Sequence, residues 1–237
     1  MAQGMFYPGA GIYYPGIYLR GMAGAAFGTD MTFSDVNSND PNAVLGPGEE
    51  LKGKSNTSPI FGGGIGYRFS PMFWADVTGA GITNLKFHDG STSAGAFTPL
   101  QGMSAKIDAI PVMFNGYLDV ARVLGVPLTY QPYLMAGVGR SRNHMGAMSG
   151  TVPGFGPVSF AGDTHYSFAW GAGAGVGIPI APNMVIDLGY EYLDLGEVRS
   201  GGSGTLTIAG TPITATAGSM KAGLRAHTVQ ASLRFGF

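Results

Sequence analysis

Apolar and polar residues alternate along the last eleven residues of the chain, from His227 to Phe237. Every second residue there is apolar, namely Val229, Ala231, Leu233, Phe235 and Phe237. Successive side chains of a β-strand point to opposite faces of the sheet. The segment is therefore predicted to be a strand with one apolar face and one polar face.

The same period of two marks seven segments upstream, so eight strands are predicted. They cover residues 16–28, 60–69, 73–88, 103–118, 131–145, 165–178, 184–198 and 222–237. In the third segment the predicted apolar face consists of Phe73, Ala75, Val77, Leu85 and Phe87. In the fifth, Arg140 faces either lipid or the rim, and the pattern does not decide between them.

Long connections alternate with short ones along the chain. The long ones are residues 29–59, 89–102, 146–164 and 199–221, and the last is expected to continue the wall as a hairpin around Gly210-Thr211-Pro212. This order is typical of barrels with short periplasmic turns and long outer loops. It predicts an all-β fold, an eight-stranded antiparallel up-and-down transmembrane β-barrel, as one domain over residues 16–237 after an N-terminal arm over residues 1–15.

Two details are expected to interrupt this regular pattern. Pro111 lies inside the fourth segment and cannot donate to a ladder, so a bulge or a local break is predicted there. Residues 119–130 are too apolar for an ordinary turn, which favours a helical turn at the membrane interface.

Composition supports a membrane location. Only 11% of residues are charged, whereas a soluble domain has about 25%. No run approaches the ~20 apolar residues of a spanning helix, and a sheet can cross lipid only when it is closed. The net charge of −1 gives no reason to expect a nucleic-acid partner. No secretory signal is visible, so we expect that the export signal has been removed.

The polar face carries charges of both signs among many glycines. These residues are Arg20, Arg68, Asp76, Asp187, Glu191 and Arg234. An eight-stranded barrel is just wide enough for side chains to fill, and buried charges persist only when paired. We therefore expect these residues to form a structural network inside the barrel, and replacing Glu191 by alanine to lower thermal stability.

Aromatic residues gather at the predicted strand ends, where the membrane interfaces would lie. They are Phe69, Phe73, Tyr190, Tyr192, Phe235 and Phe237.

Several stretches resemble the small OmpA-like and opacity-type outer-membrane proteins of Gram-negative bacteria. They are Pro132–Gly139, Asp187–Gly196, Gly16–Gly21 and the C-terminal strand. The resemblance implies an integral protein of the bacterial outer membrane, with outer-membrane lipid and lipopolysaccharide around it and barrel-assembly machinery recognising the C-terminal strand. It also implies a structural protein, surface antigen, adhesin or minor channel. Because the chain ends at Phe237, no peptidoglycan-binding domain is expected.

Candidate chemistry is sparse. His165 and Ser167 share one strand face, a spacing seen in lipid A deacylase barrels, but no acidic partner lies close in sequence. His88, His144 and His227 have no metal-ligand spacing. Residues 35–40 faintly resemble a calcium loop but lack its glycine and twelfth acidic residue. We predict no catalytic residue, no metal and no cofactor.

The sequence favours a non-enzymatic protein with a structural, envelope-integrity or surface-interaction role. A narrow channel for small solutes is the first alternative. A subunit of a larger envelope assembly is the second, because the arm carries tyrosines over residues 5–14 that could contact an envelope protein. The outer loops are the other candidate contact for such a partner. A lipid A-modifying enzyme is a remote third.

Overall fold

The computed structural model describes residues 5–7, 10–13, 16–92 and 99–237, and for the two segments before residue 16 only the backbone. Nearly all of these residues lie in antiparallel strands. No helix among them is long and apolar enough to cross a membrane.

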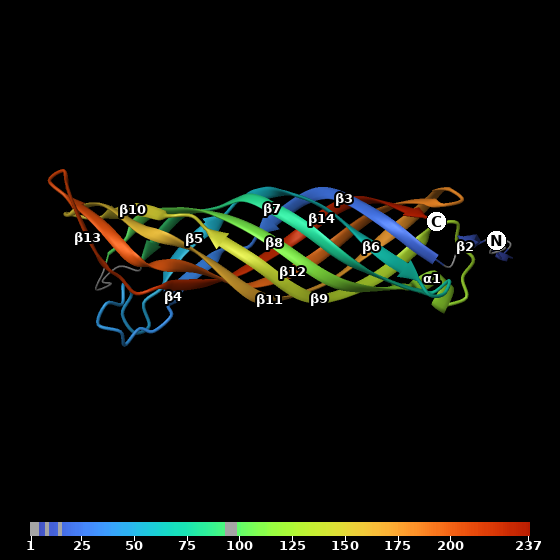
Figure 1. Cartoon of the computed structure of the whole chain (residues 1–237), viewed down its shortest axis with the longest axis horizontal. Helices are drawn as coiled ribbons and strands as arrows, with labels where there is room; N and C mark the ends of the chain where they lie inside the picture. The colour runs from blue at the N-terminus through green and yellow to red at the C-terminus, as the bar shows by residue number, and fades with distance from the viewer. Residues whose placement is uncertain (1–4, 8–9, 14–15, 93–98) are drawn as a thin grey trace.

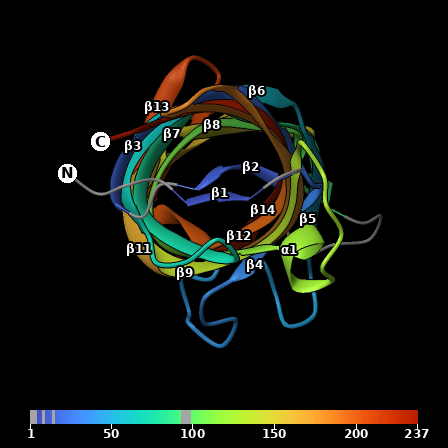
Figure 2. The same ribbon diagram turned by 90° about the vertical axis from the view of Figure 1, so that its right-hand side faces the viewer.

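Eight strands form a closed ring, seen end-on in Figure 2. In ring order they are β3 (Gly16–Gly28), β6 (Thr57–Arg68), β7 (Phe73–Thr92), β8 (Gln101–Asp119), β9 (Gln131–Met145), β11 (Gly156–Ala181), β12 (Met184–Ile208) and β14 (Met220–Gly236). The last strand pairs with the first, with Val229 opposite Ala25, so the ring has no free edge. The predicted fold class is confirmed.

The two ends of the barrel differ. Short turns lie at one end, where the first strand begins at Gly16 and the chain ends at Phe237. The amide of Phe237 donates a hydrogen bond to the Ile17 carbonyl at 3.1 Å. We call this the short-turn end, on the right of Figure 1. The long connections lie at the opposite, long-loop end. In the outer-membrane barrels that the sequence predicts, the short turns are periplasmic, which would place the long-loop end outside.

The predicted long loops contain strand segments of their own. They contain β4 (Met31–Asp35), β5 (Leu51–Ser55), β10 (Met148–Val152) and β13 (Thr211–Thr216). The hairpin expected in the last loop is confirmed by β12 pairing with β13. The prediction that residues 146–164 form a loop is wrong, because β10 pairs with the start of β11.

The strands extend far past the membrane. β11 has 26 residues and β12 has 25, whereas 9–11 tilted residues cross a bilayer. We call the projecting part, including β4, β5, β10 and β13, the cap. It occupies the left side of Figure 1.

The helical turn predicted after the fourth strand is confirmed as α1 (Val120–Val123). Asp119 forms its N-cap, and its carboxylate accepts the Arg122 amide hydrogen at 3.0 Å. At the short-turn end this turn connects β8 to β9.

Pro111 interrupts the sheet without shifting it. The pairing of β7 with β8 keeps one register from Gly79 opposite Val112 to Ile82 opposite Ala109, and the two rungs between them are missing. The pairing with β9 continues through Pro111. The local break is therefore present, whereas a bulge at Pro111 is not.

The bulge lies instead on β7, where the register shifts between Ile82 and Leu85. Asn84 has a φ of 63°, the left-handed conformation found in one type of bulge. Because one extra residue reverses the alternation, Val77 is exposed while Leu85 and Phe87 are buried inside the barrel. The prediction that all three share one face is wrong.

The interior consequently has two parts. At the short-turn end it is polar and aromatic, as the alternation predicts. In the cap it is an apolar core that includes Phe33, Leu51, Phe87, Met103 and Met145, all fully buried. The expectation of an ionic interior therefore holds for only part of the cylinder.

The N-terminal arm contains β1 (Met5–Tyr7) and β2 (Ala10–Tyr13), which pair as a short hairpin. The side chains proposed to contact an envelope partner lie outside the described set.

Candidate functional site in the barrel interior

Aromatic side chains line the interior at the short-turn end. Tyr18, Trp74, Tyr117 and Tyr133 are each at most 5% exposed. The rings of Trp74 and Tyr117 stack with centroids 5.3 Å apart, and Tyr133 meets Trp74 edge-on at 5.8 Å. These rings come from four different strands, so they fill the cylinder from several sides.

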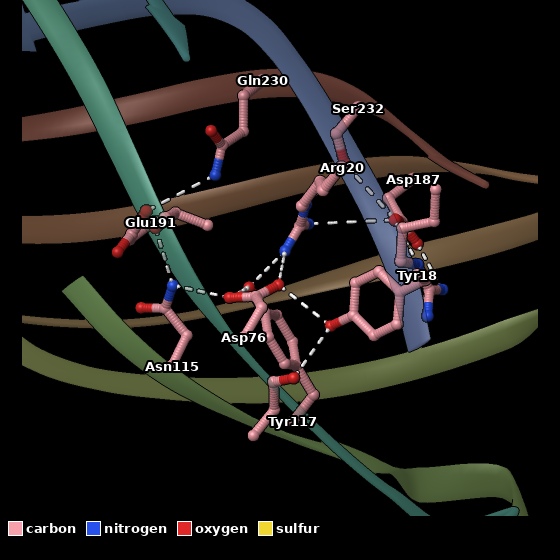
Figure 3. Close-up of polar contacts among 12 residues, drawn as sticks. Tyr18, Arg20, Asp76, Asn115, Tyr117, Asp187, Glu191, Gln230 and Ser232 are labelled. Atoms are coloured by element: carbon pink, nitrogen blue, oxygen red, sulfur yellow. Dashed lines mark hydrogen bonds and ion pairs between the residues drawn. The ribbon is translucent and has the colours of Figure 1, made fainter. Parts of the chain in front are cut away.

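Arg20 lies at the centre of the charged cluster, shown in Figure 3. Its guanidinium is 3.1 Å from Asp76 and 3.8 Å from Asp187. It also donates to Ser232 at 3.0 Å and to the Tyr117 hydroxyl. Arg20 therefore joins strands on opposite sides of the ring, which cross-links the barrel internally.

The second ion pair is between Arg234 and Asp187. Two guanidinium nitrogens donate to the two carboxylate oxygens at 2.7 and 2.8 Å, a bidentate geometry. The Arg234 guanidinium also lies 4.8 Å from the centre of the Trp74 ring. Asp187 thus holds one arginine firmly and a second at longer range.

Asp76 is held by neutral donors as well as by Arg20. Its carboxylate accepts hydrogen bonds from Tyr18 at 3.0 Å, Asn115 at 2.9 Å and Tyr117 at 3.2 Å. These hydrogen bonds replace the water that the buried carboxylate loses on folding.

The other two residues of the predicted network lie at its margins. Glu191 is buried and accepts from Gln230 at 3.4 Å. Arg68 is buried, donates to the Pro71 carbonyl at 3.1 Å and lies 5.1 Å from the Trp74 ring centre. The structure thus brings together Arg20, Arg234, Asp76 and Asp187. Glu191 lies on the side of this cluster that faces the cap, and Arg68 lies on the side of the short-turn end.

Glycines provide space for these large side chains. A Cβ atom on Gly66 would lie 2.3 Å from the Tyr18 ring, and one on Gly175 would lie 2.4 Å from the Tyr133 hydroxyl. Because both glycines point inward, their missing side chains are what allow the tyrosines to lie against the wall.

Little empty volume remains inside. A hollow of about 30 Å³ lies between the polar part and the apolar core, bordered by Arg20, Glu191 and Leu193. A second, about 50 Å³, opens at the short-turn end beside Arg68 and Arg234. The first has room for roughly two water molecules.

Sequence reasoning missed the neutral members of the network, namely Tyr18, Asn115, Tyr117, Gln230 and Ser232. The signal was available, because each occupies an inward position of its strand. A search restricted to charged residues could not select them.

The predicted interface aromatics all lie on the outer wall, but at different heights. Phe69, Phe73, Phe235 and Phe237 lie near the short-turn end, and Phe237 is 73% exposed. Tyr190 and Tyr192 are not at a strand end, because β12 continues to Ile208. The Tyr190 hydroxyl is instead 2.6 Å from a ring nitrogen of His227. The apolar residues of the terminal strand also face outward.

Ser167, the candidate nucleophile, forms hydrogen bonds with the backbone of a neighbouring strand. The Ser167 hydroxyl donates to the Glu197 carbonyl at 3.2 Å and accepts the Glu197 amide hydrogen at 3.0 Å. The part of the chain that the structure describes contains no group of three or more potential metal ligands.

Asp35, from the faint calcium loop, is buried in the cap. Its carboxylate accepts the Leu45 amide hydrogen, and its other oxygen has no hydrogen-bond partner. Burial raises the pKa of the Asp35 carboxyl above its ordinary value.

Comparison with known proteins agrees with this architecture. A family model described as outer membrane protein beta-barrel domain matches residues 8–237. The outer membrane protein PagN of Salmonella typhimurium is 31% identical over 198 residues, which cover 77% of this chain and 76% of PagN. The crystal structure of the outer membrane protein OprG from Pseudomonas aeruginosa superposes with a TM-score of 0.55 at 10% identity, over 97% of this chain and 99% of that one.

Proposed function

The chain belongs to the outer membrane protein β-barrel domain family and is an integral outer-membrane protein, and from this premise we propose that it is a closed, non-catalytic barrel that presents an ordered cap at the bacterial surface. The single observation that supports this most strongly is the filled interior. Transport through the barrel would require a continuous polar path from end to end. The structure instead has ion pairs in one part and an apolar core in the other.

The cap supports the surface role. Spanning the membrane does not require a separate apolar core outside it, so the cap represents structure built for the exterior. Its hairpin tips expose Phe155, Ile208 and Ile213 by 61%, 38% and 54%. These exposed apolar groups at the tips of the cap support a contact surface for a partner.

Single-channel recording in planar bilayers tests the closed interior. We expect the purified folded chain to give no current steps above those of protein-free bilayers. Each preparation is first shown to be folded by its faster migration in unheated electrophoresis. Reproducible steps from folded protein would overturn the closed barrel and support the narrow channel.

Catalysis on lipid A is the remote alternative and has a separate test. The Ser167 hydroxyl both donates to and accepts from the Glu197 backbone, which argues against a free nucleophile. We expect no release of fatty acid from lipid A. Release that Ser167→Ala abolishes would overturn the non-catalytic proposal.

Two partner proposals come from the ends of the chain. The outward apolar residues of β14 form the strand that barrel-assembly machinery would recognise. The N-terminal arm remains a candidate contact for another envelope protein, and cross-linking in native membranes would identify one.

A further inference from the structure

Four basic side chains project sideways from one face of the outer wall, on three neighbouring strands. We call them the wall patch, and they are Lys86 on β7, Lys106 on β8, and Arg140 and Arg142 on β9. All four are exposed, while the residues on either side of them in sequence alternate toward the interior. The patch therefore lies on the surface that surrounds the barrel and not on its top.

The wall patch begins where the lipid-facing surface ends. On β8 the outward residues Phe114, Val112 and Ile110 are apolar and about half exposed, and the outward residues above them are Asp108 and Lys106. On β9 the change comes between Val138 and Arg140. Because Arg140 and Arg142 lie directly opposite Val112 and Ile110, the patch starts beside the last lipid-facing residues and extends up the wall to Lys106. This is the border where lipid headgroups of the outer leaflet meet the wall.

The register places like charges side by side. Lys86 lies directly opposite Lys106 in the pairing of β7 with β8. Cβ atoms of directly opposed residues are about 4.5–5.5 Å apart, and like charges in that position destabilise a sheet. An anion between the two ammonium groups would convert this repulsion into attraction.

Among the described residues, the four basic side chains of the patch form no ion pair, although Arg140 lies 5.8 Å from the Tyr166 ring centre. Two acidic residues lie nearby. Asp108 accepts the Asn84 amide hydrogen at 2.9 Å, and the Asp89 carboxylate lies 2.9 Å from a ring nitrogen of His88.

Basic side chains elsewhere on the cap contrast with the patch. Arg225 is 3.0 Å from Asp194, and Arg199 and Lys221 are 2.9 and 3.6 Å from Glu197. Each of these three basic groups has an acidic partner within the chain, and Glu197 serves two of them. The charge of the wall patch is available to a ligand.

The surface at the patch is also hollowed. An open hollow of about 320 Å³ is lined by Lys86, Lys106, His88, Ser104 and Ser149. Two hydroxyls beside two ammonium groups suit a phosphate, which accepts several hydrogen bonds. Arg140 and Arg142 lie outside this hollow, opposite Val112 and Ile110, where a guanidinium suits a second phosphate in bidentate geometry.

We propose that the wall patch binds the phosphate groups of an outer-leaflet glycolipid of the lipid A type. A lipid is favoured over a soluble polyanion because the side chains point sideways at the border of the lipid-facing surface. The inference uses the membrane position of the barrel and does not depend on a closed interior.

Native mass spectrometry of the full chain in detergent tests the proposal, with lipid A carrying two phosphates as the probe. The variant Lys86→Gln/Lys106→Gln/Arg142→Gln removes three patch charges. We expect its apparent affinity to fall roughly a hundredfold, since each basic residue near an anionic surface contributes about fivefold. Lipid A stripped of phosphates should bind the unchanged chain as weakly as this variant binds the intact lipid.

The matched control is Arg199→Gln/Lys221→Gln/Arg225→Gln, which removes three paired charges from the same end. It should keep its affinity within a few-fold. If the patch variant fails to fold, Lys106→Gln alone should weaken binding about fivefold. Equal binding by patch and control variants would overturn the proposal, as would equal binding of the phosphate-free lipid. Patch-dependent binding of heparin without patch-dependent binding of lipid A would assign the site to a soluble polyanion instead.

Discussion

Asp187 is the residue on which the charged cluster depends most. It accepts two short hydrogen bonds from Arg234 and lies 3.8 Å from Arg20. Glu191, by contrast, accepts only a 3.4 Å bond from Gln230 among the interactions described. The two acidic residues are both buried in β12, so they form a matched pair for comparison.

We expect Asp187→Ala to lower the free energy of unfolding by about 3–5 kcal/mol, because two buried arginines lose a charge partner. Glu191→Ala should lower it by only about 1 kcal/mol, the usual effect of losing one buried hydrogen bond. Urea unfolding in lipid vesicles, followed by tryptophan fluorescence, measures both. The account of the cluster fails if Glu191→Ala is the more damaging change.

Gly66 and Gly79 give a second comparison. A Cβ on Gly66 would meet the Tyr18 ring at 2.3 Å and the Ala75 carbonyl oxygen at 2.6 Å, whereas nothing lies within 4 Å of a Cβ on Gly79. We expect Gly66→Ala to destabilise the barrel by about 1–3 kcal/mol through overpacking. Gly79→Ala should be nearly neutral in the same unfolding assay, and similar losses for both would contradict the proposed role of glycine.

At the scale of elements, the bulge of β7 determines what the cap contains. It turns Leu85 and Phe87 inward, where Phe87 meets the Phe33 ring edge-on at 4.9 Å. Gly196 on β12 has a φ of 75° and accompanies a second register shift. Each shift reverses which residues face the interior, so the apolar core of the cap depends on both.

The bulge predicts a specific sensitivity at Asn84. A β-branched residue disfavours a positive φ, so Asn84→Val should cost about 1–2 kcal/mol. Asn84→Gly, which adopts that φ readily, should be close to neutral. Unfolding midpoints measure the difference, and equal midpoints for the two variants would show that the bulge does not require this conformation.

β4 carries a pH-sensitive group in the cap. The pKa of Asp35 is raised in the folded cap, so the neutral carboxyl is the form that the fold favours. The resulting destabilisation is present at neutral pH and is relieved as pH falls through the raised pKa. Stability of the cap should therefore increase, relative to Asp35→Asn, as pH falls toward that raised pKa.

The measurement compares melting temperatures at pH 7 and pH 5 for the unchanged chain, Asp35→Asn and the control Asp30→Asn. Asp30 is exposed, so its variant should behave like the unchanged chain. Parallel changes in all three proteins would contradict the assignment to Asp35.

Alternation was sufficient to predict the eight strands, their order of long and short connections, and the inward residues Arg20, Asp76, Asp187 and Arg234. It could not predict β4, β5, β10 or the full length of β11, because segments rich in glycine, serine and threonine read as loops. The prediction from alternation also assumed that each strand keeps one register with its neighbours along its whole length. A single left-handed residue such as Asn84 reverses the faces, and nothing in the local pattern marks it before the structure is known.

At the scale of the whole molecule, the cylinder has three zones. The outer wall near the short-turn end is apolar and exposed, with Phe114 at 56% and Val138 at 52%. The interior at that level is charged and hydrogen bonded, and the cap beyond it is filled with apolar side chains. The central claim is that lipid surrounds the first zone and that the lipid-facing surface ends below Lys106.

Site-directed spin labelling tests that claim most directly, because the chain has no cysteine and each label position is unique. Nitroxides are placed at Val112, Val138 and Lys106, one at a time, in protein reconstituted in vesicles. The account predicts that the first two collide freely with oxygen and hardly with a water-soluble nickel chelate, and that Lys106 shows the reverse. Equal access of the chelate to Val112, Val138 and Lys106 would contradict it.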